Sequence, residues 1–148
     1  MANEIQIFNQ INDIKQIDKL RKNEYMGFCY VLDCSKGVKI GCAKEPYKRL
    51  KGLKRNIETY GQGLIKRVAL TPQHTNFKKN EKILHAHFNT QRLPNTELFD
   101  LDFESAVSVI SALNLEYKDE TDEIERRADA FLHMMKGVLG WKNPEVSK

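Results

Sequence analysis

The stretch that decides the fold is GFCYVLDCSKGVKIGC, residues 27–42. FCYVLD (28–33) is rich in aromatic, β-branched and aliphatic residues, and VKIGC (38–42) is again mostly apolar after the turn residues CSKG (34–37). Two short apolar runs joined by a glycine-containing turn are typical of a β-hairpin. The sequence therefore predicts an antiparallel pair of strands at the centre of the fold.

Downstream of this hairpin, helix-like and strand-like segments follow one another. Basic and apolar residues at helical spacing come first, then a short apolar run, then three further helical patterns. The expected elements are a basic helix over about 47–55, a third strand over LIKRVAL (64–70), a helix over about 77–90, a short extended segment at 97–101, and helices over about 103–113 and 122–138.

Upstream of the hairpin, residues 4–24 carry apolar side chains separated by polar ones. The apolar positions are Ile7, Ile11, Ile14, Ile17 and Leu20, at spacings of 4, 3, 3 and 3. This spacing predicts an amphipathic N-terminal helix over about 4–24 that packs on the rest of the chain.

Together these elements predict one domain over residues 1–148. The fold class is α+β: a small antiparallel or mixed three-stranded sheet flanked by helices, with added N- and C-terminal helices. The central unit spans about 27–101, and the C-terminal helices span about 103–138. No change in composition along the chain marks a boundary between two domains.

Composition excludes several classes of protein. The chain is 41% hydrophobic and 30% charged, which is ordinary for a globular domain. No apolar run approaches the roughly 20 residues that cross a bilayer, and the N-terminus lacks the pattern of a signal peptide. We therefore expect a cytoplasmic protein. Its cysteines (Cys29, Cys34 and Cys42) are odd in number and lack CxxC spacing, which favours reduced thiols over a zinc site formed with a histidine.

Charge is distributed unevenly along the chain. Between Lys36 and Arg92 there are fourteen Lys and Arg against three acids, a net charge of +11. Between Leu93 and Glu125 there are ten acids and a single base, Lys118. A basic segment that spans several elements is typical of a protein that binds a polyanion. The alternative is a solvated surface that the acidic segment balances in the folded state.

Glu81 is the candidate metal ligand. It lies four residues before His85, on the face of the 77–90 helix that Leu84 and Phe88 make apolar. A carboxylate at the margin of a core is costly unless it is paired or holds a cation. The residues alone leave a bound cation and an ion pair equally open.

Three further side chains are candidates for phosphodiester chemistry. The planar guanidinium of Arg49 suits two phosphate oxygens, although a solvated position on a basic helix is the commoner case. Lys39 could act from the second strand of the hairpin or be an exposed edge-strand lysine. Tyr30 could act from the first strand or belong to the core, with its hydroxyl bonded to backbone.

The order of these residues resembles that of the GIY-YIG nuclease superfamily. The resemblance is carried by GFCYVL, VKIGCAKEPYKRLKGL, NEKILHAHF and QRLPNTELFDL, and it covers about 27–101. It is greatest to the small phage branch related to the meiotically up-regulated gene domain. In that superfamily a hairpin bears a Tyr in its first strand and a Tyr/Lys-Ile-Gly triplet in its second, an Arg follows on a helix, and a Glu on a later helix holds a metal.

Each motif of the superfamily corresponds to particular residues of this chain. Residues 28–30 stand for GIY and residues 39–41 for YIG, while Arg49 and Glu81 match the family arginine and glutamate. Position 39 is Lys where many members have Tyr. Further matches to the small branch are His85, Phe88, Arg92, Glu97 and Phe99, with Asn95 the candidate for the family's final Asn.

The resemblance implies a metal-dependent DNA endonuclease that uses one divalent cation, Mg²⁺ with Mn²⁺ as an alternative, held by Glu81. Arg49 would stabilise charge in the transition state. Tyr30 would be the leading acceptor of the water proton, because the Lys39 ammonium and the metal would lower its pKa. Lys39 and His85 are the alternative acceptors.

The expected substrate is double-stranded or branched DNA, and the resemblance suggests a phage-encoded protein. The phosphate-binding residues would be Lys44, Lys48, Lys51, Lys54, Arg55, Lys66 and Arg67.

Other functions and the roles of the chain ends stay open. Two alternatives remain for the function: a catalytically inactive DNA-binding or regulatory protein, and a protein–protein inhibitor that uses the acidic segment 97–125. The terminal helices could cap the fold, contact DNA or form a homodimer, to which the apolar Phe131–Met135 segment and Trp141 point.

Overall fold

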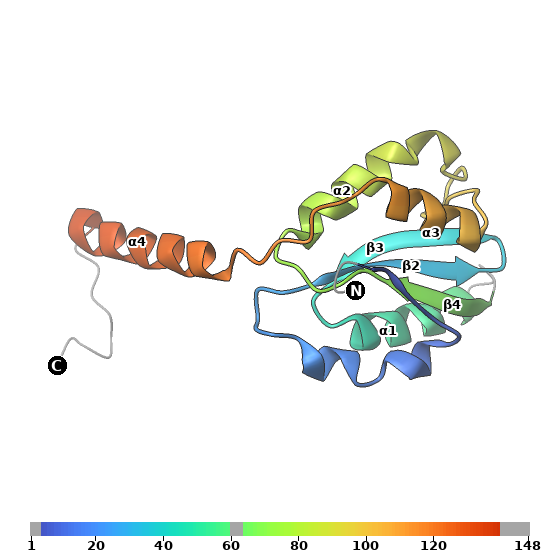
Figure 1. Cartoon of the computed structure of the whole chain (residues 1–148), viewed down its shortest axis with the longest axis horizontal. Coiled ribbons are helices and arrows are strands. Elements are labelled where there is room, and N and C mark those ends of the chain that lie inside the picture. Colours follow the sequence, from blue (N-terminus) through green and yellow to red (C-terminus); the bar gives the residue numbers. More distant parts are fainter. Residues whose placement is uncertain (1–3, 60–63, 140–148) are drawn as a thin grey trace.

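The computed structural model describes residues 4–59 and 64–139, which contain a four-stranded antiparallel sheet flanked by helices (Figure 1). The strands are β1 (Gln6–Phe8), β2 (Phe28–Cys34), β3 (Gly37–Ala43) and β4 (Ile65–Leu70), in the order β1-β4-β2-β3. The α+β class and the β2–β3 hairpin are confirmed, whereas the sheet has one strand more than predicted.

The extra strand comes from the N-terminal segment, where the predicted helix over about 4–24 is wrong. Gln6–Phe8 pairs with β4, and two 3-10 helices follow at Ile11–Ile14 and Ile17–Leu20. From Ile11 onward the apolar residues recur every three positions, which is the period of a 3-10 helix rather than an α-helix. Ile11 and Ile14 are buried, but Leu20 is 67% exposed.

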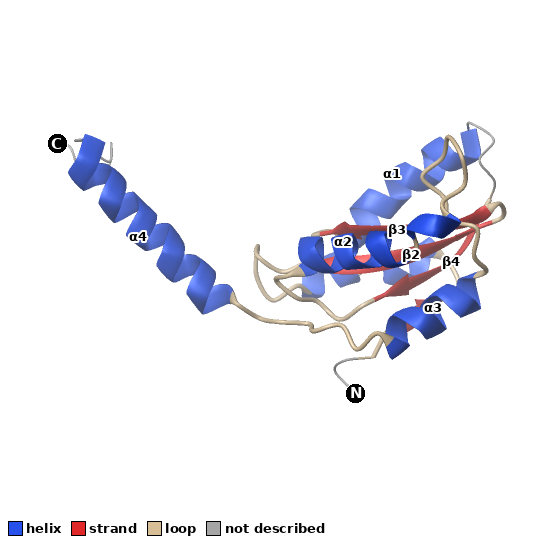
Figure 2. Cartoon of the chain, turned by 90° about the horizontal axis from the view of Figure 1, so that it is seen from above, coloured by secondary structure: helices blue, strands red, loops and turns tan. Residues whose placement is uncertain are grey.

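Helices cover both faces of the sheet (Figures 1 and 2). Helices α2 (Phe77–His87) and α3 (Phe103–Ala112) pack on one face, and α1 (Pro46–Thr59) with the 3-10 helices packs on the other. Side chains alternate along each strand, so each face has its own apolar core. The α2/α3 side contains Val31, Ile40, Leu84, Phe88, Phe99, Phe103 and Ile110, and the α1 side contains Ile14, Tyr30, Leu32, Leu50, Ile57 and Val68.

Helix α1 begins at Pro46, whose missing N–H costs nothing in the first helical turn. The carboxylate of Asp18, on the second 3-10 helix, accepts hydrogen bonds from the backbone N–H groups of Tyr47 (2.9 Å) and Lys48 (3.2 Å). These are two of the donors that a helix leaves unpaired at its start, and the negative charge also suits that end of the helix dipole. Asp18 therefore ties the start of α1 to the N-terminal segment.

Strand β3 is an edge strand, and its outer side is covered in two ways. Val38 and Phe99 exchange backbone hydrogen bonds of 3.1 and 2.8 Å. Two residues further along, Nε2 of His85 donates to the carbonyl oxygen of Ile40 at 2.7 Å. Exposed edge strands can pair with other chains. Here the 92–99 segment and α2 block that edge.

The later helices agree with the sequence, with shifted ends. Helix α2 ends at His87 instead of about 90, and a 3-10 turn (Asn89–Gln91) follows it. Arg92 therefore leaves the helical face on which its spacing from Glu81 would place it, and stacks over the Phe99 ring at 4.9 Å. Helix α4 (Thr121–Leu139) extends away from the sheet and its helices (Figure 2). None of the described helices has the length and apolar composition of a membrane span.

Stability is expected to fall on acidification because of His74, which is fully buried. Burial lowers the pKa of His74 from 6.5. The hydrogen bond that its Nδ1 donates to the carbonyl oxygen of Pro72, at 2.8 Å, raises this pKa but has the smaller effect. Below about pH 6.5 the unfolded chain takes up a proton that the folded chain resists, at a cost of up to about 1.4 kcal/mol per pH unit. Urea midpoints should therefore drop between pH 7 and pH 5.

The control for this prediction is His74→Asn, which keeps an N–H donor for Pro72 but cannot take up the proton. The variant should be less stable at pH 7 and should lose less stability between pH 7 and pH 5. An equal loss in both proteins would contradict the assignment to His74.

Candidate active site

A groove runs along β3 on the α1 side of the sheet. It consists of two adjoining hollows, of about 650 and 530 Å³, which share Leu53 and Asn56 of α1 as lining residues. One extends to Lys39 and the loop 95–98, and the other to Cys42, Lys44 and Arg49. Residues 39, 42 and 49 thus border two neighbouring hollows that share part of α1.

Tyr30 and Gly41 are paired across the hairpin beside this groove. A Cβ atom at position 41 would lie 2.5 Å from the Tyr30 hydroxyl oxygen and 2.6 Å from Cζ. The glycine therefore provides the space through which the Tyr30 side chain crosses β3. The phenol of Tyr30 is the group that lies closest to Gly41.

Arg49 and Glu81 both act on the Tyr30 hydroxyl. Burial raises the pKa of Tyr30 to about 12, the charge of Arg49 and its hydrogen bond lower that pKa, and the charge of Glu81 raises it. The guanidinium on α1 and the carboxylate on α2 therefore both lie within electrostatic range of the Tyr30 hydroxyl on β2. The expected lowering of the Tyr30 pKa by Lys39 is wrong, since burial outweighs the cationic neighbour, which is Arg49.

Glu81 is half-buried on α2, next to Cys42. Burial raises the pKa of the Cys42 thiol to about 12, and a hydrogen bond with Glu81 and the charge of Glu81 both add to this effect. The ion pairs of the described residues do not involve Glu81. Among the described residues, Glu81 therefore does not form the ion pair that was one of its two expected states.

The donor set at Glu81 fits a hydrated Mg²⁺ ion. Such ions are held through one or two carboxylates, while water and substrate phosphate fill the remaining positions. Glu81 offers one carboxylate within electrostatic range of Tyr30. The part of the chain that the structure describes has no group of three or more His, Cys, Asp and Glu side chains that could cage a metal. The three cysteines are free thiols.

Lys39 is held by Glu97. Its side chain is only 12% exposed, and its ammonium forms an ion pair with the Glu97 carboxylate. The hydrogen bond and the charge of Lys39 lower the pKa of Glu97. Because a nearly buried ammonium needs a counter-charge, Glu97 positions Lys39 in the wall of the groove.

His85 is oriented by the edge of the sheet. The carbonyl oxygen of Ile40 can only accept, so Nε2 of His85 carries a proton, and in the neutral ring Nδ1 keeps its lone pair. The ring also packs against Phe99, with centroids 5.6 Å apart. His85 lies one helical turn after Glu81, on the same side of α2.

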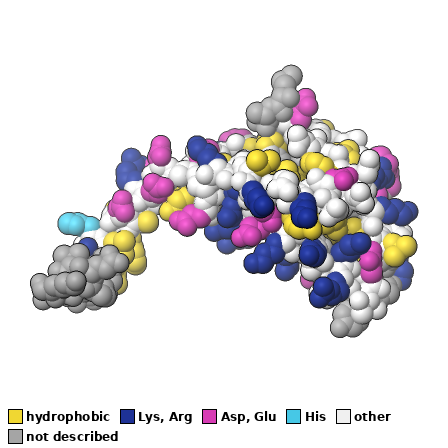
Figure 3. Space-filling model, turned by 90° about the horizontal axis from the view of Figure 1, so that it is seen from below, with side chains coloured by type: hydrophobic (Ala, Val, Ile, Leu, Met, Phe, Trp, Pro, Cys, Tyr) yellow, Lys and Arg dark blue, Asp and Glu magenta, His cyan; other side chains and the backbone are white. Residues whose placement is uncertain are grey.

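The basic residues of α1 differ in their relation to the groove. Lys44 and Lys48 line it, and Arg55 follows Lys48 by two turns on the same helical face. Lys51 approaches the Tyr47 ring at 6.0 Å, and Lys54 lies on the side of α1 away from the groove. None of these side chains takes part in the ion pairs found among the described residues. Figure 3 shows Lys and Arg side chains spread over the α1 side of the molecule.

The two basic residues of β4 lie apart from the groove. Strand β2 separates β4 from β3, and Lys66 is exposed there. Arg67 points to the α3 side, where it bonds Asp33 (2.9 Å) and Glu104 (2.6 Å) and stacks on the Phe103 ring at 4.6 Å. The structure does not bring these two residues together with Lys44 and Lys48.

Sequence reasoning missed three residues around this groove. Asp18 caps α1 from 29 residues upstream, Cys42 contacts Glu81, and Asn56 lines both hollows. The spacing of Asn56 from Arg49, seven residues on one helix, would have placed both on the same face. No comparable signal in the sequence links Asp18 to α1.

A Gly41→Ala substitution should impair both folding and activity. The added methyl group would meet the buried Tyr30 hydroxyl, so the phenol must move away from Arg49. Overpacking of this kind costs about 1–3 kcal/mol, measurable as a lower urea midpoint. Gly52→Ala is the matched control: nothing lies within 4 Å of its added methyl, and alanine within a helix should stabilise by about 0.5–1 kcal/mol. Equal effects at both positions would contradict the packing argument.

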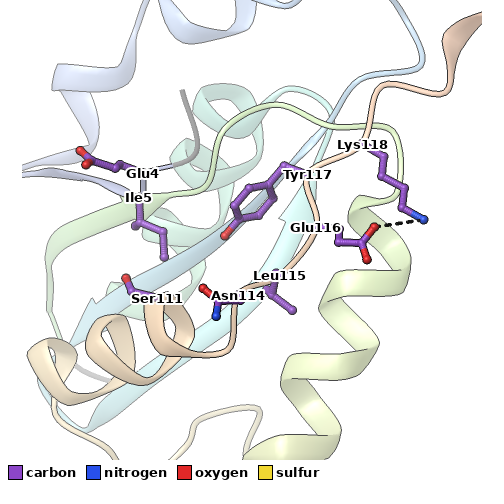
Figure 4. A pocket seen from close by; sticks show the side chains of 8 residues that line it. All are labelled: Glu4, Ile5, Ser111, Asn114, Leu115, Glu116, Tyr117 and Lys118. Atoms are coloured by element: carbon purple, nitrogen blue, oxygen red, sulfur yellow. Dashed lines mark ion pairs between the residues drawn. The ribbon is translucent and has the colours of Figure 1, made fainter. Parts of the chain in front are cut away.

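A separate hollow of about 830 Å³ lies between the N-terminal strand segment and the end of α3 (Figure 4). Ile5, Ser111 and Tyr117 are among its lining residues, and Glu116 and Lys118 form an ion pair at 3.3 Å on its rim. It is larger than either hollow of the groove, but no predicted site residue lines it.

Comparison with protein-family models identifies the T5orf172 domain, which matches residues 25–114. The chain therefore belongs to the T5orf172 domain family, a phage-associated and nuclease-related family of domains. The matched segment contains β2, β3, α1, β4, α2 and α3, and with them every site residue predicted from the sequence. The comparisons with curated proteins and with solved structures found no match.

Proposed function

We propose that this protein is a metal-dependent DNA endonuclease with a GIY-YIG-like centre, and that it hydrolyses phosphodiester bonds with one divalent cation. The observation that carries the proposal is the convergence of Tyr30, Arg49 and Glu81, from three different elements, beside one basic groove. A protein that only bound DNA would have no need of a carboxylate among these cations. Its family supports a phage origin, and its place of action would be the host cytoplasm.

Glu81 would hold Mg²⁺, or Mn²⁺, in this proposal. A cation there supplies charge stabilisation at the phosphate and the leaving oxygen. Arg49 binds two phosphate oxygens through its fork and stabilises the charge that builds up on them. Tyr30, whose pKa of about 12 keeps it protonated near neutral pH, accepts a hydrogen bond from Arg49 and can donate a hydrogen bond through its own hydroxyl to a phosphate oxygen.

Among the three candidate proton acceptors, His85 is the one we assign. Tyr30 is protonated at neutral pH, and the Lys39 ammonium is engaged by Glu97. The neutral His85 ring retains an unprotonated Nδ1 because its Nε2–H is committed to Ile40. A histidine is suited to general-base work near neutral pH.

The proposal is tested by incubating supercoiled plasmid, linear duplex and a branched junction with the full chain in Mg²⁺, in Mn²⁺ and in chelator. Cleavage in either metal and none in chelator is the expected result. Salt-dependent binding without cleavage in both metals would favour the catalytically inactive DNA-binding protein. Absence of DNA binding at low salt would overturn the proposal and favour the protein–protein module.

The groove also predicts which lysines bind the DNA backbone. Each phosphate contact contributes about 0.9 to the slope of log affinity against log salt concentration. The double variant Lys44→Ala/Lys48→Ala, at the groove, should lower that slope by about 2. Lys54→Ala/Lys66→Ala removes the same charge from positions outside the groove and should change the slope little. Equal losses in both double variants would mean that the DNA does not follow the groove.

A further inference from the structure

Two lysines of α2 lie beside the candidate site, and the phosphate-binding residues predicted from the sequence do not include them. Along α2, Glu81 and His85 form one row at the margin of the core, and Lys78 and Lys82 form the next row on its outer side. The first two side chains are half-buried, whereas both lysines are exposed. Lys78 comes three residues before Glu81 and seven before His85, so these three residues share one side of the helix.

The contacts of α2 place Lys78 at the end of β3. Nε2 of His85 donates to the carbonyl oxygen of Ile40 at 2.7 Å. The Lys78 ammonium is within electrostatic range of Cys42, two residues further along the strand. Seven residues of a helix span about 10 Å and two residues of a strand about 7 Å, so α2 runs antiparallel to the end of β3. Lys78 therefore lies beside or just beyond Cys42, where β3 leads into Lys44.

Cys42 is acted on by cations that come from opposite faces of the sheet. Burial and Glu81 raise the pKa of its thiol, whereas the charges of Lys78 and Arg49 both lower that pKa. Arg49 belongs to α1 and Lys78 to α2, and these two helices cover opposite faces of the sheet (Figure 1). The end of β3 therefore carries one of these cations on each side of the sheet.

Neither lysine of this row has an ion-pair partner among the described residues. The ion pairs there include neither Lys78 nor Lys82, although Glu81 follows Lys78 at a spacing that allows two helix residues to pair. Lys78 also stands in the first turn of α2, which contains no acid and where the helix dipole disfavours a cation. Its charge therefore does not stabilise the helix, which favours a role toward a ligand.

We propose that Lys78 and Lys82 bind backbone phosphates of the DNA substrate, so that the strand crosses the end of β3 from the groove to α2. This inference rests on the proposed function. Lys44 and Lys48 would hold phosphates on one side of the scissile bond, and the two lysines of α2 would hold phosphates on the other side. Because phosphate contacts set the position of the substrate, contacts on both sides place an internal bond of a continuous strand at the site, rather than a chain end.

Lys79 provides a matched comparison for Lys78. The two lysines are neighbours in the first turn of α2, and both are exposed. Lys79 is two residues before Glu81, which turns it roughly 160° away from that carboxylate around the helix. Lys79 therefore has the charge and exposure of Lys78 without its position at the end of β3.

Binding of a fluorescent DNA duplex to the full chain in chelator, measured over a range of salt concentrations, tests the proposal. Lys78→Gln should lower the slope of log affinity against log salt concentration by about 0.9, the contribution of one phosphate contact. Lys79→Gln should keep the wild-type slope, and so should Lys78→Arg, which retains the charge. Equal losses in Lys78→Gln and Lys79→Gln, or no loss in either, would overturn the proposal.

The crossing of β3 predicts that contacts on its two sides add. Lys48→Gln/Lys78→Gln should lower the slope by about 2, because the two residues contact different phosphates. A double variant with the slope of either single variant would show that both lysines contact one phosphate, and the crossing would then be wrong. Urea midpoints check that the variants are folded, and Lys78→Gln should not be less stable than the wild-type chain, because the helix dipole opposes the lysine.

The DNA path and the nuclease activity can fail separately. If the wild-type chain cuts DNA but Lys78→Gln keeps its salt slope, the path across β3 is wrong and the proposed function stands. If the variants show the expected slopes but the wild-type chain does not cut in Mg²⁺ or Mn²⁺, the path is supported and the endonuclease is contradicted. Absence of DNA binding at low salt would overturn both.

Discussion

A Glu81→Gln variant should lose at least about 10²-fold in metal-dependent DNA cleavage while binding DNA at least as well as the wild-type chain. Loss of a metal ligand removes several kcal/mol of transition-state stabilisation, and each 1.36 kcal/mol is tenfold in rate. The substitution keeps the shape of the side chain but removes a negative charge that repels the DNA phosphates, so DNA affinity should not fall. Single-turnover cleavage and equilibrium binding in chelator separate the two effects.

Glu45→Gln is the control for that variant. Glu45 lines the same groove and is exposed, so the change removes an equal charge from the same surface without touching Tyr30 or Arg49. It should cut DNA at nearly the wild-type rate. Titration with Mn²⁺ adds a readout that is independent of cleavage, and binding should weaken in the Glu81 variant alone. Cleavage by Glu81→Gln at the wild-type rate would contradict the proposed hydrolytic function.

The central part of the fold could be predicted from the sequence because local signals there agree with the tertiary structure. The 28–33 and 38–42 runs have the composition of strands and a turn between them, and they form β2 and β3. Glu81 and His85 are four residues apart on one helix, which places them together however the helix packs. The roles expected of Tyr30, Arg49 and Glu81 came only from a family resemblance. The match to the T5orf172 domain includes these three positions but assigns them no role.

The N-terminal segment shows why local signals fail elsewhere. Apolar residues at every third position suit a 3-10 helix as well as one face of an α-helix, and the choice depends on what the segment packs against. Here Gln6–Phe8 pairs with the exposed edge of β4, an interaction over more than 60 residues that no local pattern records. The extra strand and the loss of the predicted helix have this one cause.

The electrostatics of the site could not be predicted for a related reason. Lys39 was expected to act on Tyr30, its near neighbour in the hairpin, but its partner is Glu97, 58 residues away. Tyr30 was expected to ionise more easily beside Lys39 and a metal, but among the groups of the chain itself burial has the largest effect and raises its pKa to about 12. Both depend on which side chains the tertiary fold brings together and how far it excludes water.

An Arg49→Lys variant should cut DNA about 10²–10³-fold more slowly, the loss observed when one preorganised donor to a developing anion is removed. Lysine keeps the positive charge but cannot donate two parallel hydrogen bonds to a phosphate. It would also lose the guanidinium hydrogen bond that offsets part of the burial effect on the Tyr30 hydroxyl. The variant should therefore lose rate in the chemical step and little DNA affinity.

Arg55→Lys makes the same exchange two turns from Lys48 on the same helix, at an exposed position without an ion pair among the described residues. Since Arg55 would contact only backbone phosphates, where charge matters more than geometry, its cleavage rate and affinity should both stay near wild type. Single-turnover rates at saturating protein, with binding measured in chelator, compare the two variants directly. If Arg49→Lys weakens binding and leaves the saturated rate unchanged, Arg49 is a phosphate anchor and the transition-state role belongs to another residue of the groove.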